Sequence, residues 1–122
     1  MKNNVLIVED SMLTSQAISF MLTAHRFSVA GVAGDGEAAV KMYKKLKPDL
    51  VLMDIAMPKK HGIDAIREIR AMDPMARIIA VTALYSPEKR NAALEAGAAA
   101  VVSKPIDIPE LIRTIENLLQ KI

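Results

Sequence analysis

Five short apolar runs recur along the chain, and they constrain its fold more than any other feature. They are VLIV at 5–8, VAGVA at 29–33, LVLM at 50–53, IIAV at 78–81 and AVV at 100–102. None alternates cleanly with polar residues, and helix-like stretches separate them. Continuous apolar runs joined through helices are typical of βαβ units, whose parallel sheet is covered on both faces. The pattern predicts an α/β, (βα)₅ fold with right-handed crossover connections.

The segments between the runs carry signals for helix ends. Ser86 and Pro87 provide a capping hydroxyl and a proline for the first helical position, and Gly97 can end that helix. Asp107 and Glu110 have the spacing of a capping box, so a last helix is predicted to begin there and pack on the sheet. The apolar residues that share one face of this helix are Leu111, Ile115, Leu118 and Ile122.

Composition excludes several classes of function. The 122 residues, 52% of them hydrophobic, suit one domain with one core, predicted to span 1–122. A net charge of +2 is too small to indicate direct binding to nucleic acid or membrane, and KMYKKLK at 41–47 is interpreted as a solvated helix face. The eight methionines are interpreted as core filler. The absence of cysteine excludes disulfides and thiolate metal sites.

The N-terminal sequence MKNNVLIVED carries no targeting signal. It has only four consecutive apolar residues before two acids, which is far short of a signal-peptide core or a membrane span. We therefore expect a cytoplasmic protein.

Polar residues follow the apolar runs at the points where the predicted strands end. Glu9 and Asp10 follow the first run, Asp54 the third, Thr82 the fourth, and Lys104 comes shortly after the fifth. In an open parallel sheet, ligands bind at the carboxyl ends of the strands, so these side chains are expected to meet at one rim. Three acids repel one another unless a cation joins them, and an all-oxygen cluster selects a hard ion such as Mg²⁺.

These groups suit phosphoryl transfer to an aspartate. A carboxylate is already a nucleophile at neutral pH, so Asp54 needs no separate general base. Mg²⁺ would neutralise charge between the acids and the phosphoryl group, while Lys104 and Thr82 would each bind one of its oxygens. The plainer interpretation is that Glu9, Asp10 and Ser11 cap the first helix.

Four motifs, in order along the chain, resemble those of the receiver domain of two-component response regulators. They are VLIVEDS, DLVLMDIAMPKKHG, VTA and VSKP, and the resemblance covers essentially the whole chain. It implies a doubly wound, flavodoxin-like fold with strand order 2-1-3-4-5. It also implies Asp54 as the phosphoacceptor, Glu9 and Asp10 as the acids that organise Mg²⁺, and the main-chain carbonyl of Ala56 as a further ligand.

The same resemblance assigns the remaining groups and the partners. It implies Thr82, in VTA, as the switch hydroxyl and Lys104, in VSKP, as the lysine that precedes a proline. The Lys104–Pro105 peptide is expected to be cis by the same resemblance. The chain would be a regulatory phosphoacceptor rather than an enzyme. A histidine kinase or phosphotransfer protein would donate the phosphoryl group, and a downstream effector protein would bind the altered surface. The sequence does not distinguish a stand-alone receiver from one excised from a longer protein.

The chain departs from the family pattern at a few positions. Val101 stands where many receivers have an aromatic residue, so an aromatic two-rotamer switch is not implied. Tyr85, close to Thr82 in the sequence, is a candidate substitute for that aromatic residue, but it is interpreted as a partly buried loop tyrosine. Ala56 and Leu84 cannot hydrogen-bond a water, which predicts a phosphorylated lifetime that these side chains do not shorten. The remaining residues of note are two predicted surface histidines, His25 and His61.

Other functions fit parts of the pattern. A haloacid-dehalogenase-type phosphatase also uses a strand-end aspartate and Mg²⁺, but it needs a second acid where this chain has Ala56. A flavodoxin-like mononucleotide binder needs a phosphate loop where Glu9 and Asp10 would repel phosphate. A receiver that acts as an interaction module without phosphorylation would not need the acids, the hydroxyl and the lysine together.

Overall fold

Strands and helices alternate strictly along the chain in the computed structural model, which describes residues 3–56, 62–83 and 86–120. The strands are β1 Asn4–Val8, β2 Ser28–Ala33, β3 Leu50–Asp54, β4 Ile78–Thr82 and β5 Ala100–Ser103. The helices are α1 Met12–Ala24, α2 Gly36–Leu46, α3 Gly62–Met72, α4 Pro87–Ala96 and α5 Ile108–Gln120. The (βα)₅ prediction is therefore confirmed.

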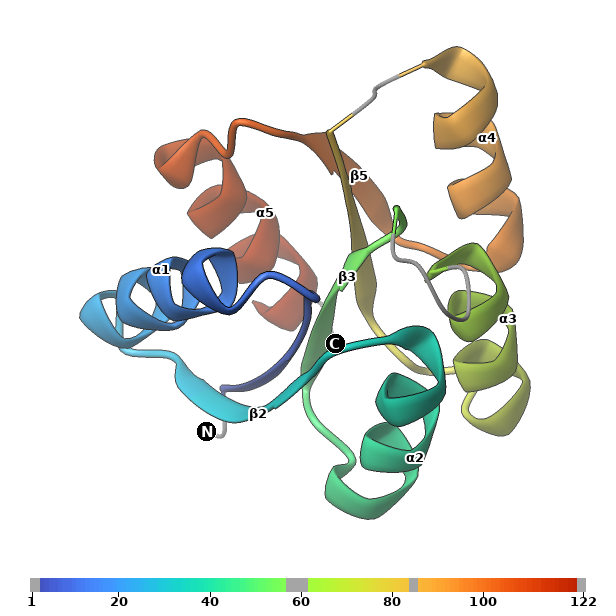
Figure 1. Ribbon diagram of the computed structural model, residues 1–122, viewed down its shortest axis with the longest axis horizontal. Helices are drawn as coiled ribbons and strands as arrows, with labels where there is room; N and C mark the ends of the chain where they lie inside the picture. Colours follow the sequence, from blue (N-terminus) through green and yellow to red (C-terminus); the bar gives the residue numbers. More distant parts are fainter. Residues whose placement is uncertain (1–2, 57–61, 84–85, 121–122) are drawn as a thin grey trace.

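The five strands form one parallel sheet in the order β2-β1-β3-β4-β5, which confirms the order that the family resemblance implied. Figure 1 shows α1 and α5 against one face of the sheet and α2, α3 and α4 against the other. The register aligns the strand ends, since Val8 pairs with Met53 and Thr82 pairs with Ser103. Residues just after the central strands are consequently delivered to one edge of the sheet.

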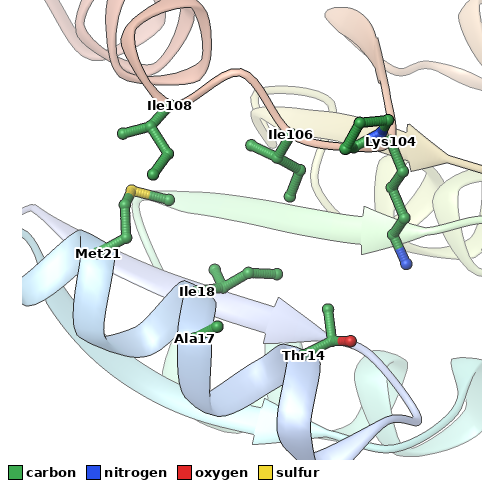
Figure 2. Close-up of a pocket in the computed structure, with 8 residues that line it drawn as sticks. Thr14, Ala17, Ile18, Met21, Lys104, Ile106 and Ile108 are labelled. Carbon is green, nitrogen blue, oxygen red and sulfur yellow. The ribbon is translucent and has the colours of Figure 1, made fainter.

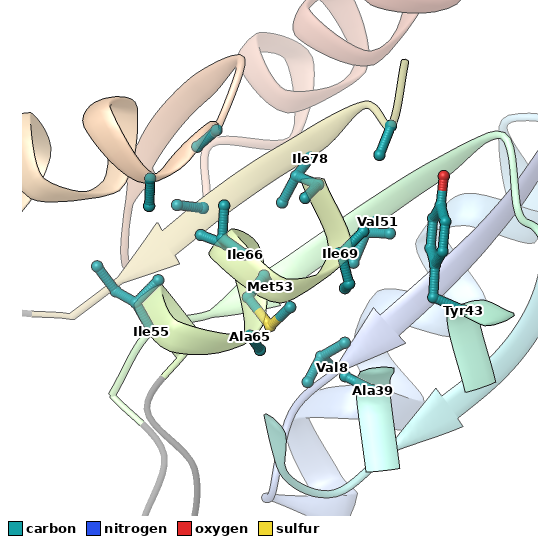
Figure 3. Packing of buried hydrophobic residues seen from close by; sticks show 14 of the residues in the cluster. Val8, Ala39, Tyr43, Val51, Met53, Ile55, Ala65, Ile66, Ile69 and Ile78 are labelled. Atoms are coloured by element: carbon teal, nitrogen blue, oxygen red, sulfur yellow. The ribbon is translucent and has the colours of Figure 1, made fainter. Parts of the chain in front are cut away.

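Two apolar clusters form the core, one on each face of the sheet. Successive strand residues enter opposite clusters, because side chains alternate across a strand: in β1, Leu6 joins the α2–α4 side and Ile7 joins the α1–α5 side. Every residue of β3 and β4 is buried, whereas β2 at the sheet edge has mostly half-buried or exposed residues. Figure 3 shows the cluster beneath α2 and α3.

The predicted helix ends are confirmed. The Ser86 hydroxyl accepts the Lys89 N–H at 3.2 Å, and Gly97 ends α4 with a φ of 124°. The Asp107 carboxylate accepts the Glu110 N–H at 3.1 Å at the start of α5. Leu111 and Ile115 on α5 are buried and Leu118 is half-buried, whereas Ile122 lies outside the described residues.

The exposure of side chains confirms that residues 41–47 form a solvated helix face, but it corrects the interpretation of all the methionines as core filler. The lysines of the 41–47 stretch are exposed and its Tyr43 is buried, as an amphipathic helix requires. The methionines do not all fill the core, because Met12 and Met75 are 75% and 79% exposed. Among the described residues, no helix is long and apolar enough to cross a membrane.

Candidate functional site

The polar residues predicted to share a rim do converge at the carboxyl ends of the central strands. Asp54 is the last residue of β3 and Thr82 the last residue of β4. Glu9 directly follows β1, and Lys104 directly follows β5. Because β1, β3, β4 and β5 are neighbours in the sheet, residues 50 and 95 positions apart in sequence come into contact there.

Burial separates these residues into two groups. Glu9 and Asp54 are each 5% exposed and Thr82 is fully buried, while Asp10 lies exposed at the outer edge. The sequence predicted that Asp54 would sit where the strand leaves the core, yet its side chain remains inside. β3 is the central strand, with β1 and β4 on either side, and so its last residue is still covered. A carboxyl group buried in this way requires close polar partners.

The three acids form one cluster, and Lys104 is the one ammonium that contacts it among residues 3–56, 62–83 and 86–120. Glu9, Asp10 and Asp54 each offer a carboxylate oxygen within 4.8 Å of the others. The Lys104 Nζ donates to Glu9 Oε1 at 2.9 Å and to Asp54 Oδ2 at 3.3 Å. Within the described part of the chain, one formal positive charge therefore faces three formal negative charges, and this surplus of negative charge favours a bound cation.

Main-chain amides hold the other oxygens of the two buried acids. Asp54 Oδ1 accepts the N–H of Ala56 at 2.9 Å, and Glu9 Oε2 accepts the N–H of Ser11 at 3.1 Å. Ser11 is also the N-cap of α1, because its hydroxyl accepts the N–H of Thr14 at 3.2 Å. The capping interpretation is thus confirmed for Ser11. Glu9 accepts one hydrogen bond from the Ser11 N–H and another from the Lys104 ammonium.

The neighbouring carboxylates of Glu9 and Asp54 favour the charged form of Lys104. Burial acts to lower the pKa of its ammonium, but the hydrogen bond to Glu9 and the charges of Asp54 and Glu9 outweigh burial and raise it above its usual value. Its main-chain N–H donates to the Thr82 carbonyl at 2.8 Å, so the ends of β4 and β5 are tied together. The Lys104–Pro105 peptide is cis, as the family resemblance implied.

The donor set fits a magnesium ion. All three candidate ligands are carboxylates, two of them are buried, and hard divalent cations prefer oxygen ligands. An acidic triad of this kind is typical of a Mg²⁺ site. The family resemblance implies the main-chain carbonyl of Ala56 as a further ligand, and Ala56 lies two residues after Asp54, the last residue of β3.

Gly62 is a residue that the sequence did not single out for the site. It begins α3, and a Cβ built on it would lie 2.6 Å from the Asp54 carbonyl oxygen and 2.5 Å from the Ile55 Cα. Only a residue without a side chain lets α3 approach the end of β3 this closely. The signal was present as the last letter of DLVLMDIAMPKKHG, but the contact that requires glycine is tertiary.

Several other predicted positions lie apart from the cluster. Val101 is half-buried and packs against the core cluster on the α2–α4 side. His25 is exposed at the end of α1, with its Nδ1 2.9 Å from the Met21 carbonyl oxygen, which confirms it as a surface histidine. His61, Leu84 and Tyr85 lie outside the described residues.

Comparison with known proteins identifies the family. The family model described as "Response regulator receiver domain" matches residues 5–116, so the chain belongs to this family. It is 38% identical over 118 residues to the chemotaxis protein CheY of Thermotoga maritima, covering 97% of this chain and 98% of that protein. It is also 38% identical to protein CcdB of Bacillus subtilis, covering 94% and 96%.

Solved structures agree with this assignment. CheY in the CheX-CheY-BeF3-Mg²⁺ complex of Borrelia burgdorferi is 34% identical, with a TM-score of 0.92 and coverage of 97% of this chain and 90% of that one. The response regulator domain of Thermotoga maritima CheB is 30% identical, also with a TM-score of 0.92, covering 100% and 99%. The chain is thus a CheY-like receiver domain with an acidic pocket, and it is regulatory rather than a catalytic enzyme. This family membership excludes the phosphatase alternative.

Proposed function

We propose that this receiver takes a phosphoryl group on Asp54 from a histidine kinase or phosphotransfer protein. The observation that carries the proposal is the buried Asp54 carboxylate, which lies 3.3 Å from the Lys104 ammonium beside two further acids. A purely structural pair would match one lysine with one acid. Among the residues that the structure describes, three acids surround one lysine, which is an arrangement suited to receiving a cation and then a phosphate group.

The transfer forms one bond and breaks one. An oxygen of the Asp54 carboxylate donates a lone pair to phosphorus, and the P–N bond of the phosphohistidine breaks with its electron pair leaving on the imidazole nitrogen. The product is an aspartyl phosphate. Lys104 stands within hydrogen-bond distance of Asp54, so its ammonium can turn to the added phosphoryl oxygens without leaving the site.

Glu9, Asp10, Asp54 and the main-chain carbonyl of Ala56 are the groups proposed to hold Mg²⁺. When bound, the ion would neutralise charge between these oxygens and the incoming phosphoryl group. Glu9 and Asp54 are fixed in advance by the amides of Ser11 and Ala56, which reduces the reorganisation needed on binding. The related complex that contains BeF3 and Mg²⁺ supports this reading.

Thr82 is proposed to report the phosphorylated state to a downstream effector protein. It is fully buried at the end of β4, and its carbonyl accepts the main-chain N–H of Lys104. A shift of the Thr82 hydroxyl toward a phosphoryl oxygen would therefore act on the ends of both β4 and β5. The added charge would bias the following loops between two arrangements. The CheY relative complexed with CheX supports a protein partner.

The test is labelling with radioactive acetyl phosphate in the presence of Mg²⁺. The wild-type chain is expected to incorporate label, and Asp54→Asn is expected to incorporate none while keeping its circular dichroism spectrum. Asp64→Asn is the matched control, because Asp64 is an exposed acid on α3 whose partner is Arg67. It should label like the wild type. Chelation of Mg²⁺ by EDTA should abolish labelling in both.

Labelling of Asp54→Asn at the wild-type level would refute Asp54 as the acceptor. A wild-type chain that neither labels nor shows NMR shifts on addition of beryllofluoride with Mg²⁺ would instead favour an interaction module that works without phosphorylation.

A further inference from the structure

A cavity of about 500 Å³ opens at the end of the sheet opposite the acid cluster. We call it the α2–α3 cleft, because the residues that line it come from the C-terminal ends of these two helices and the positions just after them. They are Tyr43, Lys44, Lys47, Met72 and Asp73. The volume falls within the range of pockets that bind small molecules, about 300–1,000 Å³. The phosphoacceptor chemistry proposed above uses none of these residues.

A smaller cavity elsewhere in the molecule shows what distinguishes the α2–α3 cleft. It has a volume of about 250 Å³ and lies between α1 and the connection from β5 to α5, as Figure 2 shows. The charged residue in its wall is Lys104, whose ammonium already donates to Glu9 and Asp54. In the part of the chain that the structure describes, the side chains of Lys44 and Lys47 have no hydrogen bond or ion pair. The cleft therefore offers two ammonium groups that a ligand could use.

The Tyr43–Asp73 pair forms a fixed part of the cleft wall. The Tyr43 hydroxyl donates to Asp73 Oδ2 at 2.7 Å, and Asp73 Oδ1 accepts the Met75 N–H at 3.0 Å. Both carboxylate oxygens thus have a donor within the protein. Tyr43 is 5% exposed, and its ring lies beside the apolar cluster under α2 and α3 (Figure 3). The pair is satisfied without a ligand, so the lysines are the groups left to bind one.

The balance of charge around the cleft favours an anion. Lys44 and Lys47 share the wall with one acid, Asp73. Arg70 and Arg77 lie close enough to the tyrosine of the pair to interact electrostatically with its hydroxyl. The C-terminal ends of α2 and α3 add about half a negative charge each. The charges named here are four positive ones against about two negative ones, and the surplus is positive.

The apolar part of the wall favours a ligand with an aromatic ring. Met72 is an apolar residue that is nevertheless 44% exposed, and thioether sulfurs make favourable contacts with aromatic rings. The methylene stems of the two lysines also present apolar surface below their ammonium groups. A ring can therefore lie against the thioether and the stems while an acidic substituent reaches the ammonium groups.

We propose that the α2–α3 cleft binds an aromatic organic anion, in which a carboxylate, phosphate or sulfonate group is attached to a ring. Lys44 and Lys47 hold the anionic group, and Met72 contacts the ring. The Tyr43–Asp73 hydrogen bond keeps the shape of the cleft, because it ties the end of α2 to the segment after α3. Binding requires neither Mg²⁺ nor phosphorylation of Asp54, so the site is separate from the proposed phosphoacceptor function.

NMR titration of the isotope-labelled chain with 1-naphthoate, in EDTA, tests the site. The main-chain amide signals of the cleft residues should shift and saturate with a Kd on the order of 1 mM, the affinity expected for a ligand of this size. 1-Naphthamide has the same shape without the charge and should bind about fivefold more weakly. The amide signal of Phe20 on α1, which is 79% exposed, should not move, because apolar exposure alone does not make the site.

Two double variants that lose the same charge test the role of the lysines. Lys44→Met/Lys47→Met should weaken binding of 1-naphthoate about fivefold. Lys41→Met/Lys45→Met is the matched control, because both of these lysines are exposed on α2 but neither lines the cleft. It should change the Kd by less than about twofold, since distant charges are screened by salt. Circular dichroism should show that both variants fold.

Three results would overturn the proposal. The first is the absence of saturating shifts at the cleft residues when 1-naphthoate is raised to about ten times the expected Kd. The second is equal binding of 1-naphthoate by the two double variants, or equal binding of 1-naphthoate and 1-naphthamide, since the anionic group would then not be recognised. The third is tighter binding of a tetraglutamate peptide at the same residues, which would assign the cleft to an acidic protein segment instead.

Discussion

The two ends of the sheet each bury polar groups, but they balance them differently. At the carboxyl ends of the strands, Glu9 and Asp54 share the ammonium of Lys104, and Asp10 lies beside the two acids. At the opposite end, the Tyr43 hydroxyl donates to Asp73 Oδ2 at 2.7 Å, one donor for one acceptor. Figure 3 shows Tyr43 at one end of the core cluster and Ile55, which follows Asp54, at the other.

The difference distinguishes a structural pair from a site kept ready for a ligand. Burial raises the pKa of Tyr43 well above its usual 10.0, and the hydrogen bond to Asp73 raises it further. The Tyr43–Asp73 pair is thus complete as it stands. The acid cluster is incomplete in the described part of the chain, because two of its three acids are buried and one ammonium offsets them there. Proteins commonly give up stability at functional sites in this manner.

The largest expected effect is on phosphorylation when the ammonium is removed. Lys104→Met should lower the rate of acetyl-phosphate labelling about 100-fold, because the charge that forms on the phosphoryl oxygens loses its donor. The control is Lys41→Met, whose ammonium is exposed on α2 and pairs only with Glu37 across one helical turn. Equal labelling rates for the two variants would remove Lys104 from the proposed chemistry.

The next effect concerns the close approach of α3 to the end of β3. Gly62→Ala should destabilise the protein by about 2–3 kcal/mol, since the added methyl group overlaps the Asp54–Ile55 backbone and something must shift. Gly34→Ala is the control, because nothing lies within 4 Å of a Cβ at that position. Urea unfolding measures both. A Gly62→Ala variant as stable as Gly34→Ala would contradict the packing described above.

At the opposite end, Tyr43→Phe should cost about 1 to 1.5 kcal/mol. The change keeps the ring in the core and removes the hydroxyl, so Asp73 Oδ2 loses its donor. A double-mutant cycle with Asp73→Asn isolates the pair from the separate contact of Asp73 Oδ1 with the Met75 N–H. A coupling energy near zero would show that the pair contributes nothing beyond packing.

The same pair predicts a dependence of stability on high pH. A folded-state pKa above the unfolded value means that the unfolded chain loses the Tyr43 proton first, so stability falls as the pH rises past about 10. At about pH 10.5, half a unit above the unfolded pKa, the free energy of unfolding should be lower by about 0.8 kcal/mol. Tyr43→Phe should lack this share of the loss. Parallel pH profiles for variant and wild type would contradict the raised pKa.

The smallest expected effect has the opposite sign. Asp10→Asn should raise stability by a few tenths of a kcal/mol, because it removes one of three clustered negative charges without removing a hydrogen bond to Lys104. The variant should also bind Mg²⁺ more weakly. Asp64→Asn, which breaks an exposed ion pair with Arg67, should not gain stability. Destabilisation by Asp10→Asn would mean that the cluster is balanced rather than in surplus.

Much of the fold and the membership of the site could be predicted from the chain itself. Apolar runs with helices between them indicate a parallel sheet, and polar residues after those runs indicate its functional edge, because strand ends are local features. The burial of Asp54 could not be predicted in this way. It depends on β1 and β4 flanking the end of β3, which is set by strand order.

Contacts between segments far apart in the sequence could not be predicted either. Tyr43 and Asp73 are 30 residues apart, and nothing in the sequence around either residue signals that they meet. Gly62 appears in the sequence as one more glycine, and only the approach of α3 to the Asp54 backbone explains it. The sequence also does not separate the exposed apolar residues of α1, Leu13 and Phe20 among them, from the buried ones, Ile18 and Leu22, because both kinds occur along the same helix.

The sequence by itself determined a (βα)₅ fold with acids, a hydroxyl and a lysine at the ends of strands, since periodicity and residue order fix which face and which end a side chain occupies. The receiver family was indicated by the resemblance of four motifs. Tertiary structure alone decided that Lys104 bridges Glu9 and Asp54, that two of the three acids are buried, and that one side of α1 stays open. Those properties depend on distances between elements, and the packing of the two core layers sets these distances.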